Sequence, residues 1–313
     1  MYVYILRRLL ATIPIMALVA VFVFMLLHLS PGDPAVIIAG DFATEDQVDK
    51  IREALGLNDP LYVQFGRWLI DLLQGDMGES IYSGMPVTEL IGQRVEPTLM
   101  LTLCTMVIAI TMAIPLGVIA AWKVGTWIDR AVMTLAVFGF SVPVFVIGYL
   151  LILGGSRTLG WFPVQGYTSI FESVPGFLSH ITLPALTLGA VYMALIARMT
   201  RATMLEVLNE DYVRTAYAKG LATRKVLVKH ALKNAMVPIS TTIGLGVALL
   251  IGGVVVTESV FAIPGLGRLT VDAVLRTDYP VIQGVILVFS FTYVLLNLLI
   301  DLTYVLFDPR IRY

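Results

Sequence analysis

Long apolar runs alternate with shorter charged segments along almost the whole chain. Six of these runs have roughly the length that a helix rising about 1.5 Å per residue needs to cross a hydrocarbon core of about 30 Å. Lipid offers the backbone no hydrogen-bond partner, so each run predicts a helix. The predicted spans are Leu9–Leu29, Thr98–Ala121, Ala131–Leu153, Thr182–Ala197, Val237–Val256 and Val281–Phe307. The pattern therefore predicts an all-α integral membrane protein with six transmembrane helices.

Composition supports a lipid environment. Of the 313 residues, 58% are hydrophobic and 14% are charged, whereas soluble chains average about 45–50% and about 25%. The net charge of −1 gives no argument for nucleic-acid binding. The single cysteine, Cys104, excludes an intrachain disulfide, a zinc cluster and a CxxC redox pair.

The distribution of basic residues predicts the orientation. With the N-terminus inside, 14 of the 21 lysines and arginines fall in inner segments and 7 in the longer outer ones, so both termini are expected in the cytoplasm. Met1–Arg8 and the following apolar run could also be a signal peptide. That run is too long and no A-x-A cleavage site follows it, which favours a retained anchor.

The outer segment after the first span carries helix signals. Thr44 and Gln47 form a capping box, and Gly56 is expected to end that helix. Asp59 is a plausible N-cap of a second helix with Pro60 at its first position. We expect a small structural cap whose apolar face lies on the membrane or on the other spans.

The inner segment Arg198–Val237 is strongly basic, and its sequence also predicts two helices. Asn209 is a candidate cap for the first, which Gly220 ends, and Thr223 is a candidate cap for the second, which runs toward Pro238. A basic segment under a membrane is usually only a topogenic signal. Helices with capping residues instead indicate an ordered element on which a partner can dock.

Residues 210–221 and 230–238 resemble the EAA loop of ATP-binding-cassette importer permeases, and most closely the dipeptide, oligopeptide and nickel branch. In that family the loop forms a coupling helix in a groove of the cytoplasmic ATPase. Thr215 and Arg214 depart from the general pattern, while Ala216 and Gly220 fit it. A small residue at 216 suggests close approach to the partner, and Gly220 suggests a left-handed turn. The resemblance assigns docking to Glu210, Asp211, Tyr212, Arg214, Thr215, Ala216, Lys219 and Gly220.

Further short matches cover nearly the whole chain, and their order and spacing suggest the "B" member of a permease pair. They are Pro31-Gly32-Asp33-Pro34, Gly75-Asp76-Met77-Gly78, Arg198-Met199-Thr200-Arg201, Pro264-Gly265-Leu266-Gly267-Arg268, Asp278-Tyr279-Pro280 and Asp308-Pro309-Arg310-Ile311-Arg312.

The resemblance implies a type I importer assembly in the inner membrane. It would contain a second, homologous permease, two ATPase subunits and an external solute-binding protein that delivers short peptides, nickel complexes or glutathione. Four regions are expected: an anchor helix (1–30), an external helical region (31–97), a five-helix permease core (98–307) with the coupling loop 198–237, and a cytoplasmic tail (308–313).

No enzyme chemistry is expected of this chain. It has no Walker A pattern and no G-x-S-x-G elbow, so ATP hydrolysis would come from the partners. Nothing in the sequence predicts a cofactor, a metal site or a nucleic-acid partner.

The rival interpretation is an ion-gradient transporter or channel. It predicts paired ionisable residues at mid-membrane depth and an inverted repeat, and the sequence shows neither. Asn297 and Asp301 share a face of the sixth span and could serve a proton relay. Because Asp301 lies near the inner end, an interhelical hydrogen bond or a position at the interface is favoured. A structural anchor, the third class, would not need a capped inner loop.

Prolines and glycines within the predicted spans affect helix shape and packing. Pro115 and Pro143 are expected to kink the second and third. Packing is favoured over a pathway role for the glycines of the fifth span, Gly244, Gly246, Gly252 and Gly253.

Overall fold

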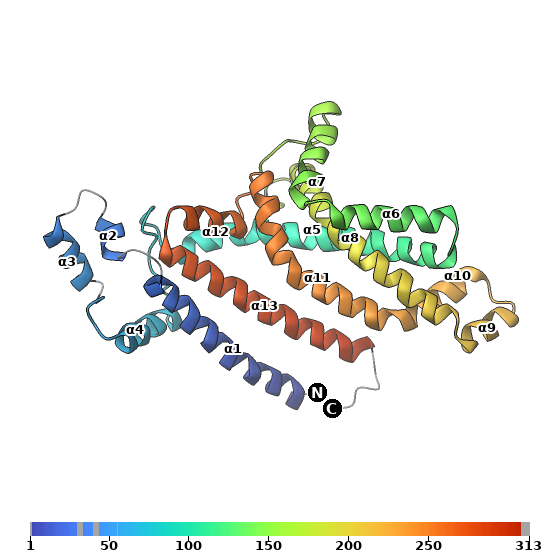
Figure 1. The fold of residues 1–313 in the computed structure, drawn as a ribbon, viewed down its shortest axis with the longest axis horizontal. Coiled ribbons are helices and arrows are strands. Elements are labelled where there is room, and N and C mark those ends of the chain that lie inside the picture. Colours follow the sequence, from blue (N-terminus) through green and yellow to red (C-terminus); the bar gives the residue numbers. More distant parts are fainter. Residues whose placement is uncertain (1, 30–33, 40–43, 55, 308–313) are drawn as a thin grey trace. The chain divides into compact units, whose positions relative to one another are not determined.

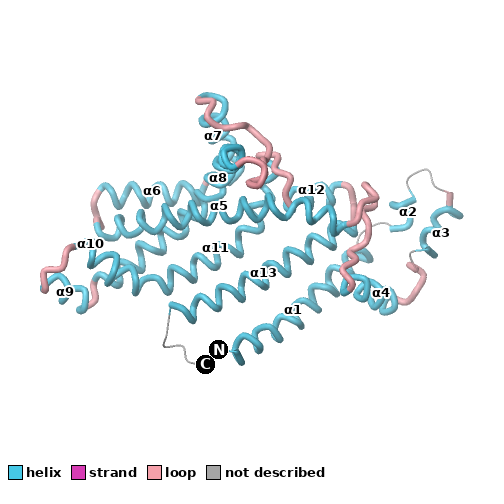
Figure 2. The backbone as a smooth tube through the Cα atoms, turned by 180° about the vertical axis from the view of Figure 1, so that it is seen from behind, coloured by secondary structure: helices cyan, strands magenta, loops and turns pink. Residues whose placement is uncertain are grey.

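The computed structural model describes residues 2–29, 34–39, 44–54 and 56–307, and these residues are helices joined by turns, without a named strand (Figures 1 and 2). Residues 31–33 and 308–312 of the sequence motifs lie outside this part. The helices are α1 (Tyr2–Leu29), α2 (Pro34–Ala39), α3 (Glu45–Ala54), α4 (Leu61–Leu73), α5 (Val87–Trp122), α6 (Trp127–Ser141), α7 (Val144–Leu151), the π-helix η1 (Ile152–Thr158), α8 (Val174–Leu208), α9 (Asp211–Ala218), α10 (Thr223–Lys225), the π-helix η2 (Val226–Leu232), α11 (Lys233–Val260), α12 (Leu266–Leu275) and α13 (Tyr279–Phe307).

The structure confirms an all-helical protein with several membrane spans. Among the described residues, four helices are long and apolar enough to cross a bilayer: α1, α5, α8 and α13. Two bent helix pairs raise the number to six if each counts as one span. The fifth predicted span is one of them, with a bend of 56° between Val247 and Gly252.

The third predicted span, Ala131–Leu153, is sharply bent at Pro143, where the sequence predicts a kink. It consists of α6 and the α7–η1 segment, which meet at an angle of 108°. Pro143 causes the break, since proline has no N–H to donate and disfavours helical backbone at the preceding residue. Val142 accordingly has an extended conformation (φ −83°, ψ 129°). Pro115, by contrast, lies inside the continuous helix α5.

The chain forms two compact units. The first contains residues 1–94 and 269–294, and the second contains residues 95–268 and 295–313. This division follows contacts within the chain, and the four functional regions expected from the sequence stay a prediction.

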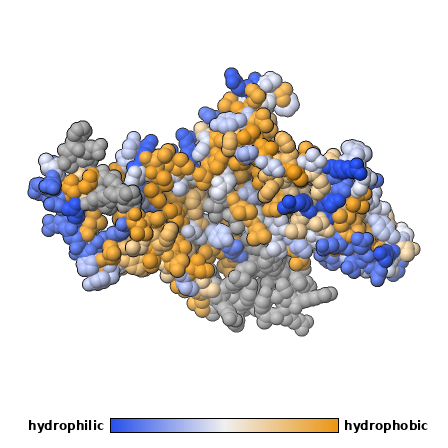
Figure 3. Space-filling view, in the orientation of Figure 1, coloured by the Kyte–Doolittle hydropathy of each residue, from blue (hydrophilic) through white to orange (hydrophobic). Residues whose placement is uncertain are grey.

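Helix α8 is the centre of the second unit, and it packs against α6, α7 and α11. Glycines permit this close packing, as predicted for the fifth span. A Cβ at Gly253 would lie 2.7 Å from the Leu188 side chain, and one at Gly246 would lie 3.3 Å from the Tyr192 ring, whereas one at Gly252 would meet nothing within 4 Å. Hydrophobic residues cover the middle of this unit, and hydrophilic residues gather at the end that carries α9 and α10 (Figure 3).

In the first unit, α4 packs against α1 through aromatic side chains. The Phe24 ring lies 5.3 Å from Phe65 and 5.8 Å from Trp68, between ring centroids. The Thr44 N–H donates to Gln47 Oε1 at 2.9 Å, which is one of the two hydrogen bonds of the predicted capping box, and Gly56 has a φ of +64°. The predicted cap at Asp59 is wrong by one residue, because the extended Pro60 occupies that position and α4 begins at Leu61.

Candidate functional site

Helix α8 continues to Leu208 without a break, so the start of the predicted inner segment Arg198–Val237 is a continuation of the fourth span's helix. Asn209 closes that helix, since its side-chain amide donates to the Leu205 carbonyl at 2.9 Å. The predicted N-caps at Asn209 and Thr223 are therefore wrong. Glu210, which is extended, precedes α9, and Ala222 precedes α10.

One face of helix α9 is buried against the π-helix η2. Val213 is 1% exposed and Ala216 is 6% exposed, and both pack against Val226 of η2. The small side chain at position 216 therefore fits this chain's own packing, and a partner would meet the opposite face of α9.

The outward face of α9 carries most of the residues assigned to docking by sequence. Exposed side chains here are Glu210, Asp211, Tyr212, Arg214, Thr215, Tyr217 and Lys219. The Tyr212 hydroxyl accepts a hydrogen bond from Asn234 Nδ2 at 2.8 Å, which ties α9 to the start of α11. Gly220 has a φ of +75°, as predicted, and lets the chain turn into α10.

A partly buried ion pair joins α6 to the part of α8 that leads into this loop. Arg201 of α8 donates from Nε to Asp129 Oδ1 at 2.5 Å and from Nη2 to Oδ2 at 2.8 Å. The Gly125 N–H also donates to the carboxylate of Asp129, and Asp129 is 4% exposed. In the sequence, Arg201 stands out only as part of the Arg198–Arg201 motif, and its partner Asp129, 72 positions away, carries no signal.

A second buried carboxylate, Glu258 at the end of α11, was also missed. Its Oε1 accepts from the Thr98 hydroxyl at 2.6 Å and its Oε2 accepts from the Arg268 N–H at 2.9 Å. A Cβ at Gly265 would lie 2.1 Å from Oε1, and one at Gly267 would lie 3.0 Å from Oε2. The glycines of the Pro264–Arg268 motif therefore let the backbone pass directly over the carboxylate.

In the first unit, two further motifs meet through one aspartate. Asp278 accepts from the Ser80 hydroxyl at 2.5 Å and from the Ile81 N–H at 3.1 Å. Ser80 and Asp278 are each 4% exposed and 198 positions apart. The contact joins the turn after Gly75–Gly78 to the start of α13.

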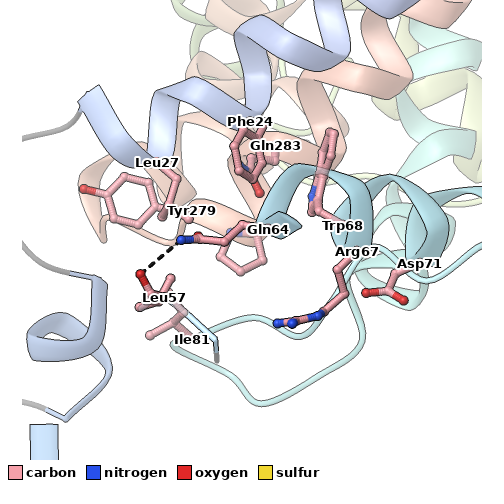
Figure 4. A pocket seen from close by; sticks show the side chains of 11 residues that line it. Phe24, Leu27, Leu57, Gln64, Arg67, Trp68, Asp71, Ile81, Tyr279 and Gln283 are labelled. Carbon is pink, nitrogen blue, oxygen red and sulfur yellow. Dashed lines mark hydrogen bonds between the residues drawn. The ribbon is translucent and has the colours of Figure 1, made fainter. Parts of the chain in front are cut away.

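A cavity of about 240 Å³ also lies in the first unit, between α1, α4 and the start of α13 (Figure 4). Phe24 and Tyr279 contribute aromatic walls, and Gln64 donates to the Leu57 carbonyl at 3.0 Å. Arg67 lines the opposite side and donates to Asp59 at 2.7 Å. Within the described ranges, no three His, Cys, Asp or Glu side chains are placed to hold a metal ion.

Two family models together match nearly the whole chain. Residues 113–313 match "Binding-protein-dependent transport system inner membrane component", and residues 1–102 match the N-terminal part of such membrane components.

Named relatives align along their full length. A probable peptide ABC transporter permease protein of Sinorhizobium fredii is 55% identical over 313 residues, which is 100% of both chains. A putative peptide transport system permease protein of Brucella abortus is 45% identical over 99% of this chain and 98% of its own. The glutathione transport system permease protein GsiC of Salmonella paratyphi A is 47% identical over 99% of each chain.

A solved structure shares the fold. The inward-facing MetNI methionine ABC transporter matches with a TM-score of 0.58 and 18% identity, covering 70% of this chain and 96% of that one.

Proposed function

Because the chain belongs to the inner membrane components of binding-protein-dependent transport systems, we propose that it carries short peptides, or peptide-like solutes such as glutathione, as one half of a permease pair. It is a multi-pass inner membrane protein and a permease subunit of an ABC importer. A second permease, two cytoplasmic ATPase subunits and an external solute-binding protein complete the proposed assembly. In it, this chain has no catalytic role.

The outward face of α9 is the observation that supports coupling to the ATPases. Val213 and Ala216 pack α9 against η2, and Tyr212 accepts a hydrogen bond from Asn234. These contacts hold α9, and with it the exposed side chains, in place on the rest of the chain. The helix follows α8 directly and precedes the α10–η2–α11 segment. A push on α9 by closing ATPases would therefore act on two helices of the packed core.

Transport would proceed by alternating access. Closure of the ATPases on ATP would press on α9, and the packed helices would change from an inward to an outward opening, into which the binding protein releases its solute. The Arg201–Asp129 pair would keep α6 and α8 moving together, since breaking it leaves the buried Asp129 charge uncompensated.

The substrate assignment rests on the relatives, whose names refer to peptides and to glutathione. Both are small solutes with peptide bonds and free charged termini.

The test is reconstitution of the four-subunit complex in liposomes that contain ATP. Uptake of labelled dipeptides and of glutathione should require ATP and the binding protein, and the chain alone should show neither uptake nor ATP hydrolysis. Uptake that does not depend on ATP and is abolished by a protonophore would favour an ion-gradient transporter instead.

A further inference from the structure

The side chains of Tyr82 and Arg276 stack at the rim of a second cavity in the first unit. The guanidinium carbon of Arg276 lies 3.9 Å from the centroid of the Tyr82 ring. The cavity has a volume of about 160 Å³. Its polar lining includes Ser80, Ser83, Arg94, Asp272 and Asp278.

The backbone that presents Arg276 is strained. Thr277 has a φ of +58°, which is unusual for a β-branched residue. It is held there because its N–H donates to the Val274 carbonyl and the Asp278 N–H donates to the Ala273 carbonyl, at 3.2 and 2.9 Å. Such strain persists where the surroundings over-determine the backbone, and it concentrates at functional positions.

The chemistry of the stack favours a carboxylate ligand. A guanidinium that stacks on a ring by its face keeps its N–H donors, which lie in its plane, available for a bidentate bond. Within the described part of the chain, Arg276 makes no salt bridge. Asp278 is already bound by Ser80 and by the Ile81 N–H.

Size decides between a small solute and a protein side chain. Pockets that enclose a whole small molecule usually measure about 300–1,000 Å³, so 160 Å³ is too small for a peptide of two or more residues. One inserted side chain fits. Tyr82, which lines the cavity, is 67% exposed, and Val274 and Leu275, which directly precede Arg276 in the chain, are 56% and 78% exposed. Tyrosine and arginine beside apolar contacts are typical of protein-interface hot spots.

We propose that this pocket is a docking socket for the external solute-binding protein, which inserts an aspartate or glutamate side chain against Arg276. The proposal rests on the proposed function, because that function and the distribution of basic residues put residues 82 and 276 on the outer side.

The experiment uses the full permease–ATPase complex in lipid nanodiscs and measures ATP hydrolysis against the concentration of solute-binding protein. Arg276→Gln and Tyr82→Ala should each raise the half-saturating concentration about tenfold, as loss of a hot-spot contact does. Tyr82→Phe keeps the ring and should match the wild type. Arg157→Gln, which removes an exposed arginine that does not line the pocket, is the matched control.

A photo-crosslinking residue at Leu275 supplies a second readout that does not depend on the Arg276 variants. It should capture the binding protein, and an adduct with lipid alone would overturn the proposal in favour of a membrane contact. An unchanged half-saturating concentration in Arg276→Gln would also overturn it. A shift in the half-saturating concentration of peptide, but not of binding protein, would assign the pocket to the cargo instead. If the wild-type complex shows no stimulation at all, the proposed function itself fails.

Discussion

The Thr98 hydroxyl donates to the buried carboxylate of Glu258 at 2.6 Å, and its oxygen accepts the Leu266 N–H at 2.8 Å. One hydroxyl thus links α5 to the end of α11 and to the first turn of α12. Because Glu258 is 0% exposed, each lost hydrogen bond leaves a polar group without water.

Replacing Thr98 with valine should therefore destabilise the protein by about 1–3 kcal/mol, because it removes one hydrogen bond to a buried carboxylate and one to a backbone N–H. Thermal unfolding of the purified complex should show a lower midpoint. Thr98→Ser retains the hydroxyl and is the control. Equal midpoints for valine and serine would show that the hydrogen bond is unimportant.

The turn over Glu258 predicts a contrast between two glycines. Gly265→Ala would put a Cβ 2.1 Å from the carboxylate and should cost at least about 1–3 kcal/mol through overpacking. At Gly252 a Cβ meets nothing within 4 Å, so Gly252→Ala should be tolerated. The yield of monodisperse protein and its unfolding midpoint check this. A stable Gly265→Ala variant would contradict the geometry.

The Asp129–Arg201 pair predicts non-additive mutations. Arg201→Met removes both hydrogen bonds that Arg201 donates to the buried Asp129 carboxylate and should destabilise the protein by about 1–3 kcal/mol. Arg201→Lys keeps the charge but loses the bidentate geometry, so a smaller loss is expected. The double variant Asp129→Asn with Arg201→Met should lose less than the sum of the single variants, which a double-mutant cycle measures. Additive losses would argue against a direct interaction.

Substitutions on the two faces of α9 should have different effects. Ala216→Glu puts a charge into the contact with Val226 and should lower stability and transport together. Tyr217→Glu changes an exposed side chain, 41% accessible, and should leave folding intact while uncoupling ATP hydrolysis from solute. Lys225→Gln should be nearly silent in both assays. Normal stimulation in Tyr217→Glu would remove the exposed face from the coupling contact.

The predicted orientation is testable with single cysteines. Gln47 and Tyr217 are both exposed, so cysteines placed there in a Cys104→Ser background should react with an impermeant thiol reagent from opposite sides of the membrane. The reagent should reach position 47 from outside intact cells and position 217 only after permeabilisation. Labelling of both positions from outside would refute the proposed topology.

The sequence by itself determined the membrane class, the spans and the family. Runs of apolar residues leave lipid as the environment, and hydrogen bonding within each run then requires a helix. Local signals were also sufficient for Gly56 and Gly220, whose positive φ follows from their position at helix ends. The caps at Asp59, Asn209 and Thr223 were each placed incorrectly, because several short polar residues can cap a helix and the register depends on packing.

Tertiary structure alone decided which distant residues meet. Asp129 and Glu258 gave no signal at their own positions, and Asp278 gave one only as part of a short motif, since a carboxylate becomes a buried anchor only when the fold brings donors to it from elsewhere in the chain. The direction of the Ala216 side chain was equally undetermined, because a small residue suits an internal contact and a partner contact alike. Periodicity reports only local geometry, whereas burial depends on contacts between segments up to 260 positions apart.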